Sequence, residues 1–178
     1  CGMDVYLTRK LALKLRKKLN KRSPKLIKIL EEVEQPLEKV LSSMEAKGIS
    51  IDTNYLKELS IELREKLDFI EKESEKITNL TFNLSSPKQL GEVLFEKLGL
   101  DQKKSRKTKT GWSTDINVLE RLEASHPLIP LLIEYRTLSK LLSTYIDAIP
   151  QLIEVETGRV HTNFNQAVTT TGRLSSSN

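Results

Sequence analysis

Residues 52–79 constrain the fold more than any other part of the chain. Their apolar side chains recur at helical intervals, at Leu56, Leu59, Leu63, Leu67, Ile70 and Ile77. This spacing predicts an amphipathic helix that ends near Asn79, and Asp52 is its expected N-cap. At about 1.5 Å per residue the helix would be roughly 40 Å long. A helix of this length with one apolar stripe must pack against a second long element.

That second element is predicted at residues 128–149, whose apolar side chains include Leu131, Leu138, Leu141, Leu142, Tyr145 and Ile149. We expect the two helices to form an antiparallel hairpin. Pro150 should end the second arm, because proline cannot donate a hydrogen bond inside a helix. The predicted fold class is mainly α, a long antiparallel helical hairpin with a small β segment at the C-terminus. Packing alone explains both stripes, so their leucines are assigned to the core.

The N-terminal part of the chain is expected to be helical and basic. Residues 1–30 carry ten lysines and arginines against one acidic residue, within a formal net charge of +5 for the whole chain. Leucines at positions 11, 15 and 19 predict an amphipathic helix with a basic outer face. Pro24 and Pro36 are each expected to open a further helix, and Gly48 to close the one that begins at Pro36.

Two segments near the expected tip of the hairpin have features of an anion-binding surface. Residues 81–87 read as a loop that ends in a capping box, with Ser86 as N-cap, Pro87 next and Gln89 at the third helical position. A helix start of this kind can hold a phosphate, although capping alone also explains Ser86. Residues 101–114 contain five basic residues and one acidic residue. We interpret them as a loop without regular structure, either simply solvated or able to reach a phosphate backbone.

Cysteine, histidine and hydropathy limit the remaining possibilities. Cys1 is the single cysteine, and His126 and His161 are too far apart in sequence for a zinc motif. A lone cysteine fits a reducing compartment. No apolar run reaches the roughly eighteen residues that a membrane span needs. We therefore expect a soluble intracellular protein, cytoplasmic in bacteria or organellar, without a membrane partner and monomeric.

The C-terminal residues are predicted to be extended. Val160, Thr162 and Phe164 alternate with polar residues, which indicates a strand with one wet face. A second extended segment is expected at residues 168–171. Beyond it Gly172 permits either sign of φ, and Arg173 supplies a planar fork of five donors. Composition alone is equally compatible with a hairpin that carries an exposed arginine.

Two linked sequence blocks resemble a known family. TGRVHTNFNQ at residues 157–166 and TTTGRLSS at residues 169–176 resemble the entry to the palm of the family A DNA polymerases. FNLSS at 82–86, KTG and ST within 109–114, and EYRTLSKLLSTY at 134–145 are similar to the thumb of that family. Residues 1–12 resemble the close of an exonuclease-like domain, with Asp4 at the aspartate of its last motif. A helix-start role for Asp4 is the simpler interpretation.

The resemblance implies a division of the chain and a set of DNA contacts. Residues 1–30 would be the end of the exonuclease-like domain and a connector, 31–150 the thumb, and 151–178 the first palm strands. Primer-template duplex would contact Asn83, Ser85, Ser86, Lys107, Lys109, Ser113, Thr114, Arg136, Lys140, Thr171 and Arg173. By the same resemblance Arg173 would lie in the minor groove at the primer terminus. Leu142 stands where many family members carry a lysine.

The resemblance also implies a DNA-directed DNA polymerase as the parent protein, with the remaining palm, the fingers and the exonuclease-like domain as partners of this segment. In that family the catalytic carboxylates and their Mg²⁺ ions come from residues that would follow Asn178. We therefore expect no catalytic residue, metal ligand or cofactor in these 178 residues, and no synthesis by them alone. A stand-alone module that binds duplex DNA and a purely structural helical bundle are the alternatives.

Overall fold

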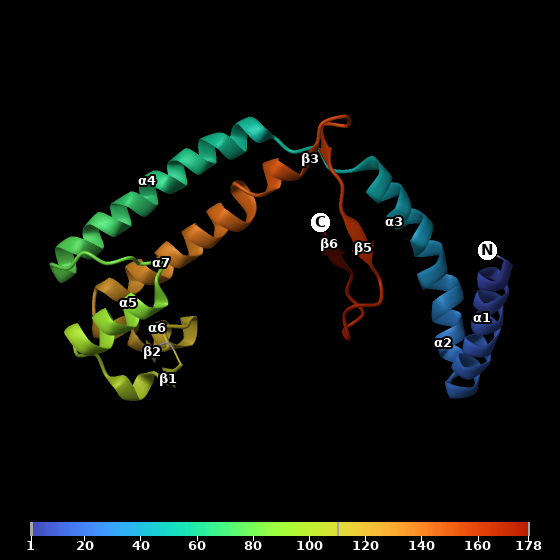
Figure 1. Ribbon diagram of the computed structural model, residues 1–178, viewed down its shortest axis with the longest axis horizontal. Helices are drawn as coiled ribbons and strands as arrows, with labels where there is room; N and C mark the ends of the chain where they lie inside the picture. The colour runs from blue at the N-terminus through green and yellow to red at the C-terminus, as the bar shows by residue number, and fades with distance from the viewer. Residues whose placement is uncertain (1, 110, 178) are drawn as a thin grey trace. The chain divides into compact units, whose positions relative to one another are not determined.

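The computed structural model describes residues 2–109 and 111–177 (Figure 1). The chain divides into two compact units. We call Asp52–Gln151 the hairpin unit, and the described residues up to Ile51 together with those from Leu152 onward the flanking unit. Helices dominate both units, and the strands are short antiparallel pairs, so the predicted mainly α fold is confirmed. The segment predicted as the thumb begins at residue 31. In the structure residues 31–51 belong to the flanking unit, and the hairpin unit begins at Asp52.

The first arm of the hairpin is helix α4, Thr53–Thr78. Its predicted cap is present, since Asp52 Oδ1 accepts hydrogen bonds from the backbone N–H of Asn54 at 3.1 Å and of Tyr55 at 3.0 Å. Asn79 ends the helix in the left-handed conformation, with φ of 53°. The predicted start and end of this helix are thus confirmed, because capping chemistry fixes both.

The second arm is helix α7, Leu128–Leu141, and continues as one π-helical turn, η5, Leu142–Ile146. It lies beside α4 (Figure 1). The continuous helix ends at Ile146, so the prediction that Pro150 ends it is wrong; Pro150 lies in the 3₁₀ turn η6, Ile149–Leu152.

The π turn also changes which side chains are buried in this arm. It closes with a bond from Asp147 N to Leu142 O of 2.9 Å. Leu142 and Ile146 pack against Leu63 of the first arm, whereas Tyr145 is 50% exposed. The predicted core position of Leu141, which is 40% exposed, and the predicted place of Tyr145 on the buried stripe are therefore wrong, because the stripe of this arm runs through Leu142 and Ile146.

The main core lies where short helices fold back onto the far end of the two arms. These helices are α5, Pro87–Glu92; the π turn η2, Val93–Lys97; α6, Ile116–Leu122; and the 3₁₀ turn η4, Glu123–Ser125. Their leucines and Phe95 pack on Ile70, Leu128, Ile129 and Leu132 of the arms. This core anchors the short helices between the two arms, which we call the tip segment, to the hairpin.

Residues 101–114 are partly regular, which corrects the prediction of a loop without regular structure. They form a 3₁₀ turn η3, Gln102–Lys104, and an antiparallel pair, β1, Lys107–Thr108, with β2, Gly111–Trp112. The Trp112 ring packs on Phe95 with centroids 5.4 Å apart. An aromatic anchor inside a polar segment therefore ties the basic residues to the core.

The N-terminal helices of the flanking unit are α1, Gly2–Arg22; α2, Pro24–Ile29; the π turn η1, Leu30–Glu34; and α3, Gln35–Lys47. The predicted N-terminal helix is present. Pro36 does not open a separate helix, because α2, η1 and α3 run on without a break. Pro36 has no N–H to donate to the preceding turn of the helix. The π turn directly before it, closed by the bond from Gln35 N to Leu30 O, accompanies this missing bond within the continuous helix. Gly48 ends α3 with φ of 64°, as predicted.

The strands of the flanking unit are β3, Ile153–Glu154; β4, Arg159–Val160; β5, Asn163–Asn165; and β6, Ser175–Ser177. β3 pairs with β4, and β5 pairs with β6 through Phe164 opposite Ser176. The second extended segment was predicted at 168–171, which is wrong, because the chain turns there. In this turn Thr169 Oγ1 donates to Arg173 O at 2.5 Å, and Gly172 has φ of 76°.

The predicted strand through residues 160–165 is interrupted at His161. Its ring bonds the carbonyl of Glu45 through Nδ1 at 2.7 Å and lies against Gly48. Val160, Thr162 and Phe164 nevertheless line one small pocket with Met44 and Ile49, as their alternation predicted. Among the described residues, no helix has the length and hydropathy that a membrane crossing requires.

Ser74 provides a test of this packing. Its side chain is 0% exposed, and its Oγ has no hydrogen-bond partner among the described residues. Ser74→Ala should raise the free energy of unfolding by about 1 kcal/mol, because it removes an unsatisfied buried hydroxyl and adds a better helix former. Urea denaturation followed by circular dichroism measures this change.

Ser60→Ala is the matched control in the same helix. Ser60 Oγ donates to Asp147 Oδ1 at 3.0 Å, so its removal should lower stability. A Ser74→Ala protein no more stable than the parent would contradict the interpretation.

Candidate nucleic-acid interface

An open cleft of about 630 Å³ lies in the hairpin unit between the second arm and the tip segments. We call it the arm cleft. Three stretches of chain form its walls: the turn before α5, the residues around β2, and one face of α7 with η5. The cleft is lined by Ser85, Pro87, Thr108, Trp112, Ser113, Thr114, Asp115, Tyr135, Arg136, Ser139, Lys140 and Ser143. Among these are Ser85, Ser113, Thr114, Arg136 and Lys140, which the sequence singled out.

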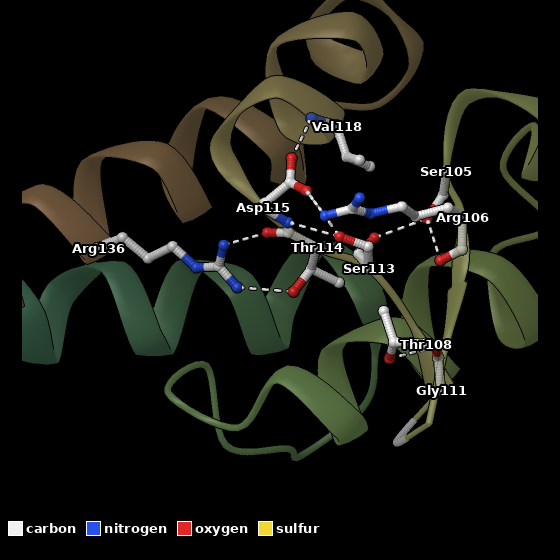
Figure 2. A network of polar contacts seen from close by, with 9 residues as sticks. All are labelled: Ser105, Arg106, Thr108, Gly111, Ser113, Thr114, Asp115, Val118 and Arg136. Atoms are coloured by element: carbon white, nitrogen blue, oxygen red, sulfur yellow. Dashed lines mark hydrogen bonds and ion pairs between the residues drawn. The ribbon is translucent and has the colours of Figure 1, made fainter.

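Arg136 is the half-buried cation of the arm cleft. Its guanidinium donates from Nη2 to Thr114 Oγ1 at 2.8 Å and from Nη1 to the Thr114 carbonyl (Figure 2). Burial lowers the pKa of Arg136, and the nearby Asp115 carboxylate opposes this shift. Arginine still keeps its proton in proteins. The result is a cation bonded to uncharged oxygens, with donors left over for an anion.

The segment from Ser113 to Asp115 is held rigidly by its own polar contacts (Figure 2). Ser113 Oγ donates to Asp115 Oδ2 at 2.8 Å, and Asp115 Oδ1 accepts from the N–H of Val118 at 3.1 Å. Ser105 Oγ donates to the Ser113 carbonyl at 2.7 Å. The hydrogen bond from Ser113 and then that from Val118 lower the pKa of Asp115. The segment that receives Arg136 is thereby preorganised.

Tyr135 is a site residue that the sequence analysis did not assign. It is 7% exposed, and its hydroxyl donates to Glu71 Oε1 at 2.8 Å while Ser85 Oγ lies 3.2 Å from it. Burial raises the pKa of this phenol. The side chain therefore links both arms to the turn before α5. The sequence could have indicated this role, because Tyr135 follows Leu128 and Leu132 at helical spacing. A tyrosine on a buried helix face needs a hydrogen-bond partner for its hydroxyl.

The other predicted residues of the tip have different surroundings. Asn83 Oδ1 accepts from Ser85 N at 2.8 Å, and the N–H of Asn83 donates to Gln89 Oε1 at 2.8 Å. Ser86 caps α5 by accepting from Gln89 N at 3.4 Å. These contacts shape the turn, and the glutamine of the predicted capping box bonds Asn83 instead of Ser86. Lys107 is exposed with its Nζ 5.1 Å from the Trp112 ring centre.

The remaining predicted residues lie outside the lining of the arm cleft. Lys109 is exposed beside residue 110, which lies outside the described residues. Thr171 and Arg173 are exposed and belong to the flanking unit. Asp4 lies in the first turn of α1. Within residues 2–109 and 111–177, no group of three or more His, Cys, Asp or Glu side chains is placed to hold a metal ion.

An open cleft that carries Arg136 is thus the main polar feature of the hairpin unit. The model of "DNA polymerase family A" matches residues 53–178. The chain therefore belongs to DNA polymerase family A.

Individual relatives agree with this assignment. The chain is 58% identical over 178 residues to DNA polymerase I of Synechocystis sp. and 47% identical over 149 residues to DNA polymerase I of Geobacillus stearothermophilus. These matches cover 100% and 84% of the chain, but only 18% and 17% of the two relatives. The chain thus spans less than a fifth of the length of these relatives.

A solved structure gives the same result for the fold. The POL domain of Pol1 from M. smegmatis, in complex with DNA primer-template and dNTP, superposes with a TM-score of 0.69 at 33% identity. The match covers 85% of this chain and 28% of that one. Most of this chain therefore has the same fold as part of that polymerase domain.

The cap at Asp115 predicts a pH dependence of stability. Because its pKa is lowered from the ordinary 3.8, folding favours the carboxylate, and this stabilisation is complete above pH 3.8 and is lost as pH falls through the lower, folded-state pKa. Asp115→Asn removes the titrating group. The difference in stability between the parent and this variant should shrink as the pH is lowered below 3.8.

Urea midpoints of both proteins, measured from neutral pH downward, test this expectation. Groups common to both proteins cancel in the difference. A difference that stays constant across the acidic range would contradict the assigned role of the carboxylate.

Proposed function

We propose that this chain is the thumb and first palm strands of a DNA-directed DNA polymerase, and that the arm cleft binds the sugar-phosphate backbone of primer-template duplex. The observation that carries the proposal is Arg136. It is half-buried, it donates to the two oxygens of Thr114, and it forms no direct ion pair with a carboxylate of the described residues. A half-buried guanidinium that is not paired directly with a carboxylate attracts a phosphate strongly.

The surroundings of Arg136 suit a phosphate backbone. Lys140 lies one helical turn further along α7, is exposed, and lines the same cleft. Ser139 adds a hydroxyl on the same face, whereas Ser143 Oγ donates to the carbonyl of Ser139 at 2.8 Å. The one carboxylate of the lining, Asp115, already accepts two hydrogen bonds. Contacts of this kind fix the position of a duplex without reading its sequence.

The predicted contact residues are proposed to have two kinds of role. Lys140, Lys107 and Lys109 are exposed cations that neutralise phosphates directly. Ser113 and Thr114 are buried, and their hydroxyls are engaged by Asp115 and Arg136, so they position the cleft wall. Asn83 and Ser86 shape the turn before α5. This turn places Ser85 in the arm cleft, where its backbone and its hydroxyl are proposed to contact the duplex.

Thr171 and Arg173 are proposed to act at the primer terminus. Arg173 follows Gly172, whose φ of 76° shapes an exposed turn. Minor-groove acceptors recur in all correct base pairs, so one arginine can probe pair geometry without reading sequence. A mismatch would leave a donor unpaired at about 1 to 3 kcal/mol. This corresponds to roughly ten- to a hundredfold slower extension.

The chemical step is proposed to depend on parts of the polymerase other than these residues. In family A the transfer uses Mg²⁺ held by carboxylates. The described residues do not fit such a site, since no three ligand side chains gather there. Primer-template duplex and the remaining polymerase domains are therefore the proposed partners. The relatives are bacterial DNA polymerases I, and we propose that the polymerase acts in the cytoplasm as a monomer.

Duplex affinity and its salt dependence test the binding role. If about five phosphates are neutralised, log affinity should fall with log salt with a slope of about −4 to −5. Lys140→Ala should reduce the steepness by about 1, because one phosphate contact is lost. Fluorescence anisotropy with a labelled primer-template duplex measures both quantities.

Lys72→Ala is the matched control, because Lys72 is an exposed lysine of α4 outside the arm cleft. It should leave affinity and slope nearly unchanged. Absence of salt-sensitive binding, or equal effects of the two variants, would remove the proposed role of the cleft.

Primer extension tests the assignment of the chemical step. The 178-residue chain should show no nucleotide addition with Mg²⁺ and all four nucleotides, while a longer family member under the same conditions extends the primer. The measurement is gel analysis of a labelled primer. Mg²⁺-dependent extension by the purified chain would overturn this part of the proposal.

A further inference from the structure

Two walls of the arm cleft differ in the hydrogen bonds that they can offer. On the wall formed by α7, the guanidinium of Arg136 can only donate. On the wall formed by the turn before α5, backbone donors are already engaged. The N–H of Asn83 donates to Gln89 Oε1 at 2.8 Å, and that of Ser85 donates to Asn83 Oδ1 at 2.8 Å. The N–H of Ser86 donates to the carbonyl of Asn83 at 3.0 Å. A phosphate, which needs donors, is therefore suited to the α7 wall rather than to the turn.

The side chain of Ser85 is joined to two others in a chain of hydrogen bonds. Ser85 is exposed and lines the arm cleft, and its Oγ lies 3.2 Å from the hydroxyl of Tyr135. Distance alone allows either hydroxyl to donate. Tyr135 has one hydroxyl proton, however, and donates it to Glu71 Oε1 at 2.8 Å. Because a carboxylate has no proton to give back, Ser85 must donate to the Tyr135 oxygen. We call this sequence of bonds, from Ser85 through Tyr135 to Glu71, the hydroxyl relay.

Two properties of Tyr135 agree with this direction of the hydroxyl relay. Burial raises the pKa of Tyr135, whereas the hydrogen bond from Ser85 lowers it, as expected of a donor to the phenol oxygen. A phenol that donates to a carboxylate is also a stronger acceptor, because hydrogen bonds in a chain polarise one another. The Ser85 proton is therefore held on the side of Tyr135, which is 7% exposed.

The hydroxyl relay determines what Ser85 can do in the arm cleft. A serine hydroxyl has one proton and two lone pairs, and the proton is engaged by Tyr135. The group that remains for a ligand is an acceptor. Phosphate oxygens are acceptors as well, so they cannot bond to it. The matching ligand group must be a hydrogen-bond donor.

A nucleic-acid strand carries such a donor on its backbone when the sugar is ribose. The 2′-hydroxyl of ribose both donates and accepts, and A-form helices display it in their wide, shallow minor groove. Since each sugar lies between two phosphates, a strand whose phosphates meet Arg136 and Lys140 brings its sugars into the same cleft. The guanine amino group is the other donor of the minor groove, but it belongs to the base and not to the backbone.

We propose that Ser85 is a specificity-determining residue of the arm cleft, which accepts a hydrogen bond from the 2′-hydroxyl of a ribonucleotide strand paired with DNA. Tyr135 and Glu71 are positioning residues, because they hold the Ser85 proton away from the cleft. The inference rests on the proposed function of the arm cleft and adds a preference to it. The α7 wall supplies the charge for the phosphates, and the turn before α5 recognises the sugar.

The test removes the donor of the sugar with little change in the shape of the duplex. A DNA strand is paired with a second strand whose sugars carry either a 2′-hydroxyl or a 2′-fluorine. Fluorine favours the same sugar pucker but has no proton to donate. Fluorescence anisotropy with the 178-residue chain gives a dissociation constant for each duplex, and their ratio measures the preference. The modified strand is used once as primer and once as template, so that both strands are sampled.

The unsubstituted chain should bind the hydroxyl duplex about two- to tenfold more tightly than the fluoro duplex in at least one of these arrangements, as expected for one net hydrogen bond. Ser85→Ala should abolish this preference by weakening the hydroxyl duplex alone. Ser85→Thr should retain it, because the hydroxyl is kept. Ser139→Ala makes the same change on the α7 wall of the cleft and should leave the ratio unaltered.

Tyr135→Phe tests the direction of the hydroxyl relay. Without the phenol oxygen the Ser85 proton can turn to a phosphate, so the fluoro duplex should bind about two- to tenfold more tightly than it binds the parent. This gain should disappear when Ser85→Ala is added, because it comes from the Ser85 proton. Circular dichroism checks that each variant is folded. Equal effects of Tyr135→Phe with and without Ser85→Ala would overturn the inference, since Tyr135 would then act only through packing.

The remaining outcomes separate the inference from the proposed function. Salt-sensitive binding with equal affinity for the hydroxyl and fluoro duplexes would overturn the inference and leave the proposed function intact. Equal weakening of both duplexes by Ser85→Ala would also overturn it, because Ser85 would then donate to a phosphate. Absent or salt-independent binding of every duplex would overturn the proposed function itself.

A last comparison distinguishes the two donors of the minor groove. In an all-DNA duplex, guanine is replaced by hypoxanthine, which lacks the amino group. Affinity should not depend on this replacement through Ser85. A loss of affinity that occurs in the parent but not in Ser85→Ala would assign the lone pairs of Ser85 to the base and overturn the ribose assignment.

Discussion

The burial of the apolar stripe of α4 against the second arm is the constraint on which the rest of the hairpin unit depends. Leu63, Leu142 and Ile146 meet near one end of the arms, and the larger core forms at the other. In proteins most of the stability of a helix comes from tertiary packing of its apolar face, so this packing must hold α4. The arm cleft is built on the larger core through Trp112 and Tyr135, and its geometry follows from this core.

Some features of the fold could be predicted from the sequence and others could not, and the reasons are physical. Asp52 and Asn79 mark helix ends through local chemistry, and their roles were predicted correctly. Tyr145 was misplaced because the π turn before Asp147 shifts the buried face, and periodicity alone carries no sign of such a turn. The high charge of residues 101–114 suggested an irregular loop. The Trp112 ring, which packs on Phe95 at a tilt, instead orders this segment through a contact between residues distant in sequence.

The candidate site was predicted as a set of residues but not as an arrangement. Ser85, Arg136 and Lys140 do line one cleft. The engagement of Ser113 and Thr114 by neighbouring groups depends on distances that only the folded chain defines. The same is true of Tyr135, whose hydroxyl joins three segments.

The π turn η5 has an evolutionary consequence. Because it holds one residue more than an α-helical path would, loss of a residue within Leu142–Ile146 would restore regular winding without breaking the arm. Residues beyond the turn would keep nearly the same orientation, because the wider turn already absorbs the additional residue. Asp147, whose Oδ2 lies 2.6 Å from Arg64 Nη2, would then stay near its partner. A single-codon deletion could thus keep both the rod and the direction of the chain that leaves it.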